Sequence, residues 1–222
     1  FSEKIYQLNK IWQCSSIPSL DFNVPFVKRN NNKNIIFGSF AKIFKVNESV
    51  INTWSKILKE TPSTKLFLKC SSFDILDTRE QILKKFENNN ISKNQIIFEG
   101  TSSRADYLNC YNNIDIILDV FPVSGASTSF DASYMGVPIL TKIDKNSYSF
   151  RAGESINQNL NMEDWIAENE DDYILKAKKF CSSKDELIKL KNELRNRALK
   201  SSLYDSKSFS NDFYEMLLDI KK

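Results

Sequence analysis

The feature of this sequence that most constrains its fold is an alternation of short apolar runs with segments of helical spacing. The apolar runs lack polar alternation, which is typical of strands covered on both faces; they are residues 35–37, 66–68, 96–98, 114–120 and 137–140. Between the first two runs, Val50, Trp54 and Ile57 fall on one helical face. Strands that alternate with helices are joined by right-handed crossovers. The sequence therefore predicts an α/β fold with a doubly wound parallel sheet.

The rest of the chain is expected to flank this sheet domain. Residues 1–33 have no clear period, and the polar stretch 28–33 is typical of a linker. No strand signal follows residue 150, and helices are predicted at 169–182, 184–201 and 206–220. We expect residues 1–33 to be a linker or the tail of a preceding unit and 34–168 to be the sheet domain. Residues 169–222 are then C-terminal helices that pack on the sheet or on a neighbouring unit.

Charge and composition exclude several classes of function. The 222 residues carry 31 basic and 28 acidic side chains, and a net charge of +3 is too balanced for a nucleic-acid-binding surface. The lysines are expected on the solvated surface. No apolar run approaches the roughly 20 residues of a membrane helix, and no signal peptide opens the chain. The four cysteines are widely spaced, as in a protein with buried, reduced thiols. We therefore expect a cytoplasmic protein without nucleic-acid or membrane partners.

The absence of histidine limits the chemistry further. The chain has no His-based metal site, no Ser-His-Asp triad and no His general base. No other set of metal ligands stands out, so we expect no metal site. The first residue is Phe and not Met, which we interpret as the start of a piece of a longer protein. Any His-based acid–base chemistry would then lie in the preceding part.

Two loops are expected at the edge of the sheet where ligands bind. Open parallel sheets bind ligands at the carboxyl ends of their strands, at the point where the strand order reverses. In the commonest topology this point lies between the first and fourth strands. Here the first strand leads into residues 38–47 and the fourth into residues 121–131. Neither loop has the glycine pattern of an NAD-binding or P-loop site, so these common sites are not indicated.

The second loop has the composition of an anion-binding site. The small residues Ser124, Gly125 and Ala126 let backbone N–H groups approach a ligand. The helix expected after them favours negative charge at its N-terminus. Ser127 and Thr128 are candidate hydroxyl donors, although Ser or Thr before a helix is also an ordinary N-cap.

Two charged residues complete the candidate site. Lys45 follows the first strand and would neutralise phosphate in the same crevice, or else belong to the solvated surface. Asp131 would accept hydrogen bonds from ribose hydroxyls, or else be an acidic residue favoured by the helix dipole.

At these residues the sequence resembles the O-linked N-acetylglucosamine transferase and SPINDLY family. Residues 38–40 and 45–47 resemble the family's GSFN…KIN signature. Further stretches fit its bacterial members in the same order: 103–108, 114–122, 127–138, 153–156, 164–167 and 202–205. The likeness covers essentially the whole chain. It implies a GT-B fold of two Rossmann-like halves, of which this chain is the C-terminal, nucleotide-sugar-binding half, preceded by an N-terminal half and tetratricopeptide repeats.

The resemblance also implies roles for single residues at the nucleoside. Lys42 falls at a position that helps to hold the base, and Arg104 at a basic position beside the nucleoside. Tyr107 occupies a position where some members have His. Asp131 matches the carboxylate that binds the ribose.

Other matched residues belong to the diphosphate. Lys45 matches the lysine that contacts the donor diphosphate and supports departure of the nucleoside diphosphate. Ser127 and Thr128 match a Thr-Thr pair at the same group. Ala126 departs from the family, which has Gly, His or Thr there, so one contact to sugar or phosphate is expected to be missing.

The function implied by the resemblance is the donor-binding half of an inverting, metal-independent protein O-glycosyltransferase. It would transfer N-acetylglucosamine from UDP-N-acetylglucosamine to Ser or Thr of a polypeptide acceptor. A lysine and helix N-terminal amides can stabilise the leaving diphosphate without a metal, so no cofactor is expected. Two alternatives stay open: a SPINDLY-type transferase that uses GDP-fucose, and a degenerate, non-catalytic scaffold, which Ala126 favours. This chain by itself is not expected to turn over.

Overall fold

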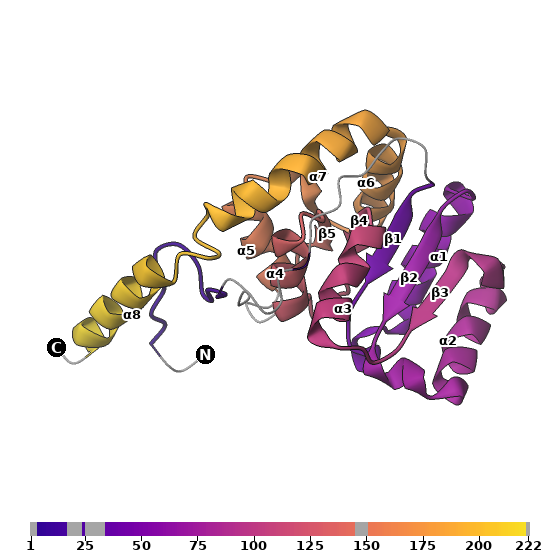
Figure 1. Ribbon diagram of the computed structural model, residues 1–222, viewed down its shortest axis with the longest axis horizontal. Coiled ribbons are helices and arrows are strands. Elements are labelled where there is room, and N and C mark those ends of the chain that lie inside the picture. The colour runs from indigo at the N-terminus through magenta and orange to yellow at the C-terminus, as the bar shows by residue number, and fades with distance from the viewer. Residues whose placement is uncertain (1–3, 17–23, 25–33, 145–150, 221–222) are drawn as a thin grey trace.

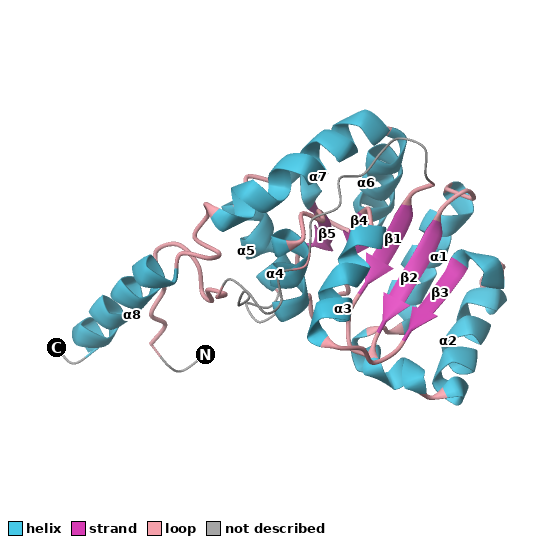
Figure 2. Cartoon of the chain, viewed as in Figure 1, coloured by secondary structure: helices cyan, strands magenta, loops and turns pink. Residues whose placement is uncertain are grey.

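Six parallel strands form a single sheet at the centre of the molecule (Figures 1 and 2). The structure is a computed structural model that describes residues 4–16, 24, 34–144 and 151–220. The strands are β1 (Ile36–Ser39), β2 (Lys65–Lys69), β3 (Ile96–Glu99), β4 (Ile116–Leu118), β5 (Ile139–Lys142) and β6 (Ile166–Ala167). Their order is β3-β2-β1-β4-β5-β6, and every pairing is parallel. The predicted doubly wound α/β fold is confirmed.

Helices cover both faces of this sheet (Figure 1). On one face lie α1 (Glu48–Glu60), α2 (Leu76–Asn88) and α6 (Glu170–Ser182). On the other lie α3 (Arg104–Cys110) and α4 (Ser127–Tyr134), with α5 (Ala152–Asn159) beside β5 and α7 (Lys184–Leu199) across α4. Helix α1 has the buried face that the sequence spacing predicts: Val50, Trp54 and Ile57 are fully buried. The Asn47 side chain caps its N-terminus.

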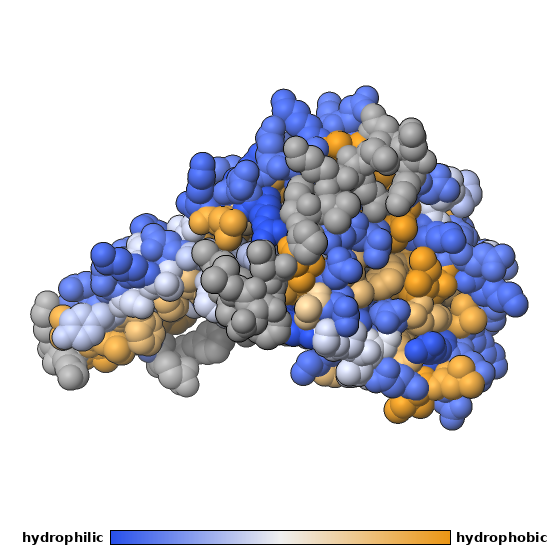
Figure 3. Space-filling view, viewed as in Figure 1, coloured by the Kyte–Doolittle hydropathy of each residue, from blue (hydrophilic) through white to orange (hydrophobic). Residues whose placement is uncertain are grey.

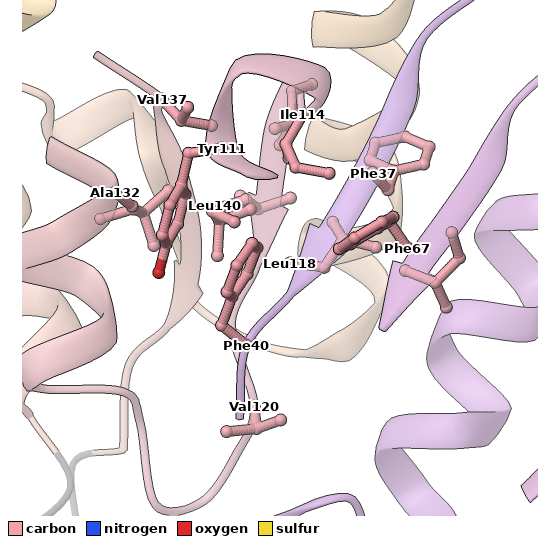
Figure 4. Close-up of a cluster of buried hydrophobic side chains, with 14 of the residues drawn as sticks. Phe37, Phe40, Phe67, Tyr111, Ile114, Leu118, Val120, Ala132, Val137 and Leu140 are labelled. Atoms are coloured by element: carbon pink, nitrogen blue, oxygen red, sulfur yellow. The ribbon is translucent and has the colours of Figure 1, made fainter. Parts of the chain in front are cut away.

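A cluster of aromatic and aliphatic side chains fills the space between β1, β4 and the helices in front of them (Figure 4). Phe40, just after β1, stacks on the buried Tyr111 with ring centroids 3.9 Å apart and 8° between the planes. Phe67 of β2 lies 6.0 Å from Phe40. The start of the first loop is therefore anchored in the core, because Phe40 is 6% exposed.

Several sequence predictions differ from the structure. Strand β6 lies after residue 150, where no strand was predicted, because two residues carry no periodic signal. Lys69 and Lys191 are buried instead of solvated. Lys69 donates to the carbonyl oxygen of Gly100, and Lys191 donates to that of Ile114. The four cysteines are free, as predicted, but half-buried. The predicted linker at 28–33 lies outside the described residues.

The last helix, α8 (Ser206–Ile220), differs from the other C-terminal helices. Helices α6 and α7 pack on the sheet domain, whereas α8 has no buried residue and extends away from it (Figure 1). It runs beside the N-terminal segment, where Lys10 Nζ donates to Ser208 Oγ at 2.8 Å. No helix within the described ranges is long and apolar enough to cross a membrane.

Candidate functional site

The strand order reverses between β1 and β4, which are neighbours in the sheet. The loops that follow these two strands therefore leave the same edge of the sheet, as the sequence predicted. A side-chain hydrogen bond joins them, because Asn47 Nδ2 donates to the carbonyl oxygen of Phe121 at 2.7 Å.

Lys45 reaches from the first loop onto the second. It ends a 3-10 turn, Ile43–Lys45, whose next residue, Val46, is buried. Its Nζ donates to the carbonyl oxygen of Ser124 at 3.0 Å. Lys42 precedes this turn and is exposed. The turn therefore directs one of the two predicted lysines to the small-residue loop.

The buried carboxylate of Asp119 accepts hydrogen bonds from the backbone of that loop. Asp119 is 4% exposed; its Oδ1 accepts from Val120 N at 2.9 Å and Gly125 N at 2.8 Å, and its Oδ2 accepts from Thr141 Oγ1 at 2.8 Å. Burial raises the pKa of Asp119 to about 6, although these hydrogen bonds and nearby Lys45 act in the opposite direction. Sequence reasoning left Asp119 out of the site; its signal was an acidic residue inside the apolar run 114–120.

The small-residue loop ends at the N-terminus of α4. Ala126 occupies the N-cap position and provides no side-chain cap, and Ser127 is the first helical residue. Neither hydroxyl of Ser127 or Thr128 has a hydrogen bond among the described residues, so the ordinary N-cap interpretation does not describe this helix. Gly125 is closely packed here: a Cβ atom would lie 2.7 Å from Thr128 Oγ1, so this hydroxyl would have to move. The geometry leaves an open helix N-terminus with two hydroxyl groups, which suits an anion.

The structure also brings together three residues predicted at the nucleoside. Arg104 donates to both carboxylate oxygens of Asp131, at 2.9 Å and 2.5 Å. Its guanidinium lies over the Tyr107 ring, 5.2 Å from the centroid. Tyr107 packs edge-on against Phe40, and burial raises its pKa to about 12. The sequence did not predict that Arg104 and Asp131 pair with each other.

A groove of about 730 Å³ opens beside the Ser124 loop. Lys45, Ser124 and Ala126 line one part of it, and Arg151 and Glu154 of the α5 N-terminus line another. The N-terminal segment and Met216 of α8 form much of the rest of its lining. Sequence reasoning assigned no role to Arg151 or Glu154. Within the described part of the chain, no group of three or more Cys, Asp or Glu residues is placed to hold a metal ion.

This architecture is that of one half of a GT-B glycosyltransferase. A solved structure of the Thermobaculum terrenum O-GlcNAc transferase (K341M mutant) has a TM-score of 0.84 at 24% identity, covering 96% of this chain and 40% of that one. The glycosyltransferase WaaG, involved in lipopolysaccharide biosynthesis, has a TM-score of 0.56 at 14% identity and covers 83% and 47%. The sequence model of glycosyl transferase family 41 matches residues 27–213, and the chain belongs to this family.

Curated relatives agree with this assignment. A tomato (Solanum lycopersicum) protein described as "Probable UDP-N-acetylglucosamine--peptide N-acetylglucosaminyltransferase SPINDLY" is 29% identical over 177 residues, which is 79% of this chain and 19% of that protein. The Caenorhabditis elegans UDP-N-acetylglucosamine–peptide N-acetylglucosaminyltransferase is 22% identical over 183 residues, 82% of this chain and 16% of that protein. The chain thus spans about a fifth of the length of these relatives.

Proposed function

We propose that this chain is the donor-binding half of a protein O-glycosyltransferase that takes N-acetylglucosamine from UDP-N-acetylglucosamine. The observation that carries the proposal is the convergence of Lys45 Nζ on the Ser124 loop at the open N-terminus of α4. A nucleoside diphosphate develops negative charge as it leaves, and fixed cations and amide dipoles stabilise that charge. Lys45 and the first turn of α4 supply both, so the proposed reaction needs no metal. Its proposed inverting course rests on the family resemblance.

The nucleoside has a proposed place next to this diphosphate site. Arg104, Asp131 and Tyr107 lie together and flank the second turn of α4. Asp131 is already paired with Arg104, so a ribose would share or displace that pair in order to bond the carboxylate. Lys42, exposed before the Lys45 turn, is the proposed further contact to the base.

The complete reaction requires partners beyond this chain. We propose an N-terminal half that provides acid–base groups and, before it, tetratricopeptide repeats that present a polypeptide acceptor in the cytoplasm. Residues 1–33, 34–168 and 169–222 are then the linker, the nucleotide-sugar-binding domain and the C-terminal helices.

Nucleotide binding and a lysine substitution test the proposal. UDP should raise the unfolding temperature of the wild-type protein, and Lys45→Ala should weaken UDP binding by about tenfold or more, the loss of one charge-assisted contact. Lys59→Ala on the outer side of α1 is the matched control, since Lys59 is exposed and lies outside the groove. In the complete protein, Lys45→Ala should lower the transfer rate by about 10²–10³-fold.

The same assay separates the alternatives. Preference for GDP and GDP-fucose over UDP and UDP-N-acetylglucosamine would assign the SPINDLY-type donor, and the donor proposed here would then be wrong. Protection by neither nucleotide at millimolar concentration would contradict a donor site altogether and favour the non-catalytic scaffold.

A further inference from the structure

The groove beside the Ser124 loop contains an ion pair, with a buried carboxylate, that the proposed diphosphate and nucleoside contacts do not use. Glu154 Oε2 accepts from Arg151 Nε at 2.5 Å, and Oε1 accepts from Arg151 Nη2 at 2.6 Å. The Glu154 side chain is 7% exposed and that of Arg151 41%. Both side chains line the groove. A bidentate pair of this kind holds both groups in a fixed geometry.

A short chain of hydrogen bonds places this pair next to the proposed diphosphate site. Lys45 Nζ donates to the Ser124 carbonyl oxygen at 3.0 Å, and Ser124 Oγ accepts from Gly153 N at 3.1 Å. Gly153 is the residue before Glu154 and is closely packed, because a Cβ atom there would lie 2.3 Å from Thr141 Oγ1. Ser124 therefore contacts Lys45 on one side and the start of α5 on the other.

The candidate groups near α4 therefore lie in the order nucleoside, diphosphate and sugar, which is the order of these parts in a nucleotide sugar. Asp131, paired with Arg104 of α3, lies in the second turn of α4, and Ser127 opens its first turn. Lys45 meets the loop before that turn, and the Arg151–Glu154 pair lies beyond Ser124. With a nucleoside at Asp131 and a diphosphate at Ser127 and Lys45, the next group of the donor enters the groove at Arg151 and Glu154.

The charge of the pair indicates what kind of group binds there. Glu154 neutralises Arg151 and would repel a phosphate, so the pair is not a second anion site. A fixed guanidinium and carboxylate offer donors and acceptors together, which suits a neutral ligand with several hydroxyl groups. The N-terminal segment adds apolar surface to the groove from Ile5 and the half-exposed Trp12. Apolar surface usually accompanies a few fixed polar groups in a ligand site.

We propose that the Arg151–Glu154 pair binds the hydroxyl groups of the donor sugar and sets which sugar the site accepts. This inference rests on the proposed function and extends it to a specificity-determining pair. The N-terminal segment completes the sugar site from the other side, and Asn159 of α5 anchors that segment by donating from Nδ2 to the Lys10 carbonyl oxygen at 3.3 Å.

The test compares nucleoside diphosphates with their sugar-bearing forms in the complete protein. Affinities for UDP, GDP, UDP-N-acetylglucosamine and GDP-fucose are measured by calorimetry for wild type, Glu154→Gln and Arg151→Lys. Glu154→Gln keeps the shape of the side chain and Arg151→Lys keeps its charge. Glu193→Gln is the control in a more exposed Arg–Glu pair outside the groove. We expect each groove variant to lose about tenfold in affinity for the preferred sugar nucleotide and to bind the free diphosphate as wild type does.

Each other result overturns the inference in a recognisable way. If both affinities fall together, or if neither changes, the pair does not bind the sugar, although wild-type binding of the free diphosphate leaves the proposed function standing. If wild type binds no nucleotide, the proposed function fails and the sugar site fails with it. A purely structural role for the pair would not change the ratio of the two affinities.

Discussion

Asp119 connects several parts of the candidate site through its buried carboxylate. Its two carboxylate oxygens connect the end of β4, the Gly125 amide and Thr141 of β5. Gly125 and Gly153 both approach this carboxylate so closely that a Cβ atom would lie 3.3 Å and 2.6 Å from its oxygens. The conformations of the small-residue loop and of the α5 start are thus both linked to one buried acid.

The ionisation of Asp119 predicts a dependence of stability on pH. The folded-state pKa is raised from 3.8 to about 6, so the folded protein favours the protonated acid. The protonated acid therefore stabilises the folded protein relative to the ionised acid. This stabilisation is present below about pH 4 and is lost as the pH rises through about 6. Asp119→Asn does not titrate, so its free energy of unfolding should rise relative to wild type by about 2 kcal/mol from pH 4 to pH 8. Urea unfolding of both proteins across this range measures the difference; a constant difference would contradict the shifted pKa.

At the scale of elements, α7 is fastened to the two central strands at the end of the sheet opposite the site. The Lys191 ammonium donates to the Ile114 carbonyl oxygen and to Asp115 Oδ1, the latter at 3.3 Å. Asp115 Oδ2 in turn accepts from Ile36 N at 2.8 Å. Side chains of both charged residues are at most 6% exposed. One helix therefore stabilises the start of both β1 and β4, whose other ends carry the candidate site.

Replacing this lysine should destabilise the fold. Lys191→Met removes a buried partner of Asp115 and should lower the free energy of unfolding by about 3–5 kcal/mol, since it leaves a buried charge poorly compensated. Glu193→Gln, on the same helix, breaks an exposed pair with Arg197 and should cost at most about 1 kcal/mol. Urea unfolding compares the two variants. Equal, small losses would mean that the buried pair contributes no more than the exposed one.

At the scale of the whole molecule, the sheet and its covering helices form one packed domain. Helix α8 and the N-terminal segment lie at one end of it (Figure 1). Helix α8 leaves large apolar side chains exposed; they are Phe213, Tyr214, Leu217, Leu218 and Ile220. Figure 3 shows hydrophobic residues gathered along one edge of this helix. We therefore expect the free energy of unfolding of the sheet domain to depend little on the outer part of α8.

Truncation tests that independence. Deletion of residues 212–222 removes no side chain that the structure describes as buried, and it keeps Phe209, which packs against the core. We expect the free energy of unfolding to change by less than about 1 kcal/mol, because surface changes away from packed features have small effects. Circular dichroism should show the loss of helix at the same time. A loss of several kcal/mol would instead show that α8 stabilises the sheet domain.

The sequence by itself determined the first five strands, the C-terminal helices and their order along the chain. The apolar runs became β1 to β5, and helices predicted at 169–182, 184–201 and 206–220 lie at 170–182, 184–199 and 206–220. The strand reversal between the first and fourth strands followed from the commonest topology of such sheets. These features are local, since a strand or helix is recorded in the spacing of neighbouring residues.

Only the tertiary structure decided which side chains meet and what their surroundings do to them. Arg104 and Asp131 lie 27 positions apart, Lys45 and Ser124 79 positions apart, and no spacing pattern pairs them. The pKa of Asp119 and the buried pair of Lys191 with Asp115 likewise arise from burial by distant segments. Contacts and desolvation depend on how the whole chain folds. The sequence therefore indicated which two loops meet at the edge of the sheet but not the hydrogen bonds between their residues.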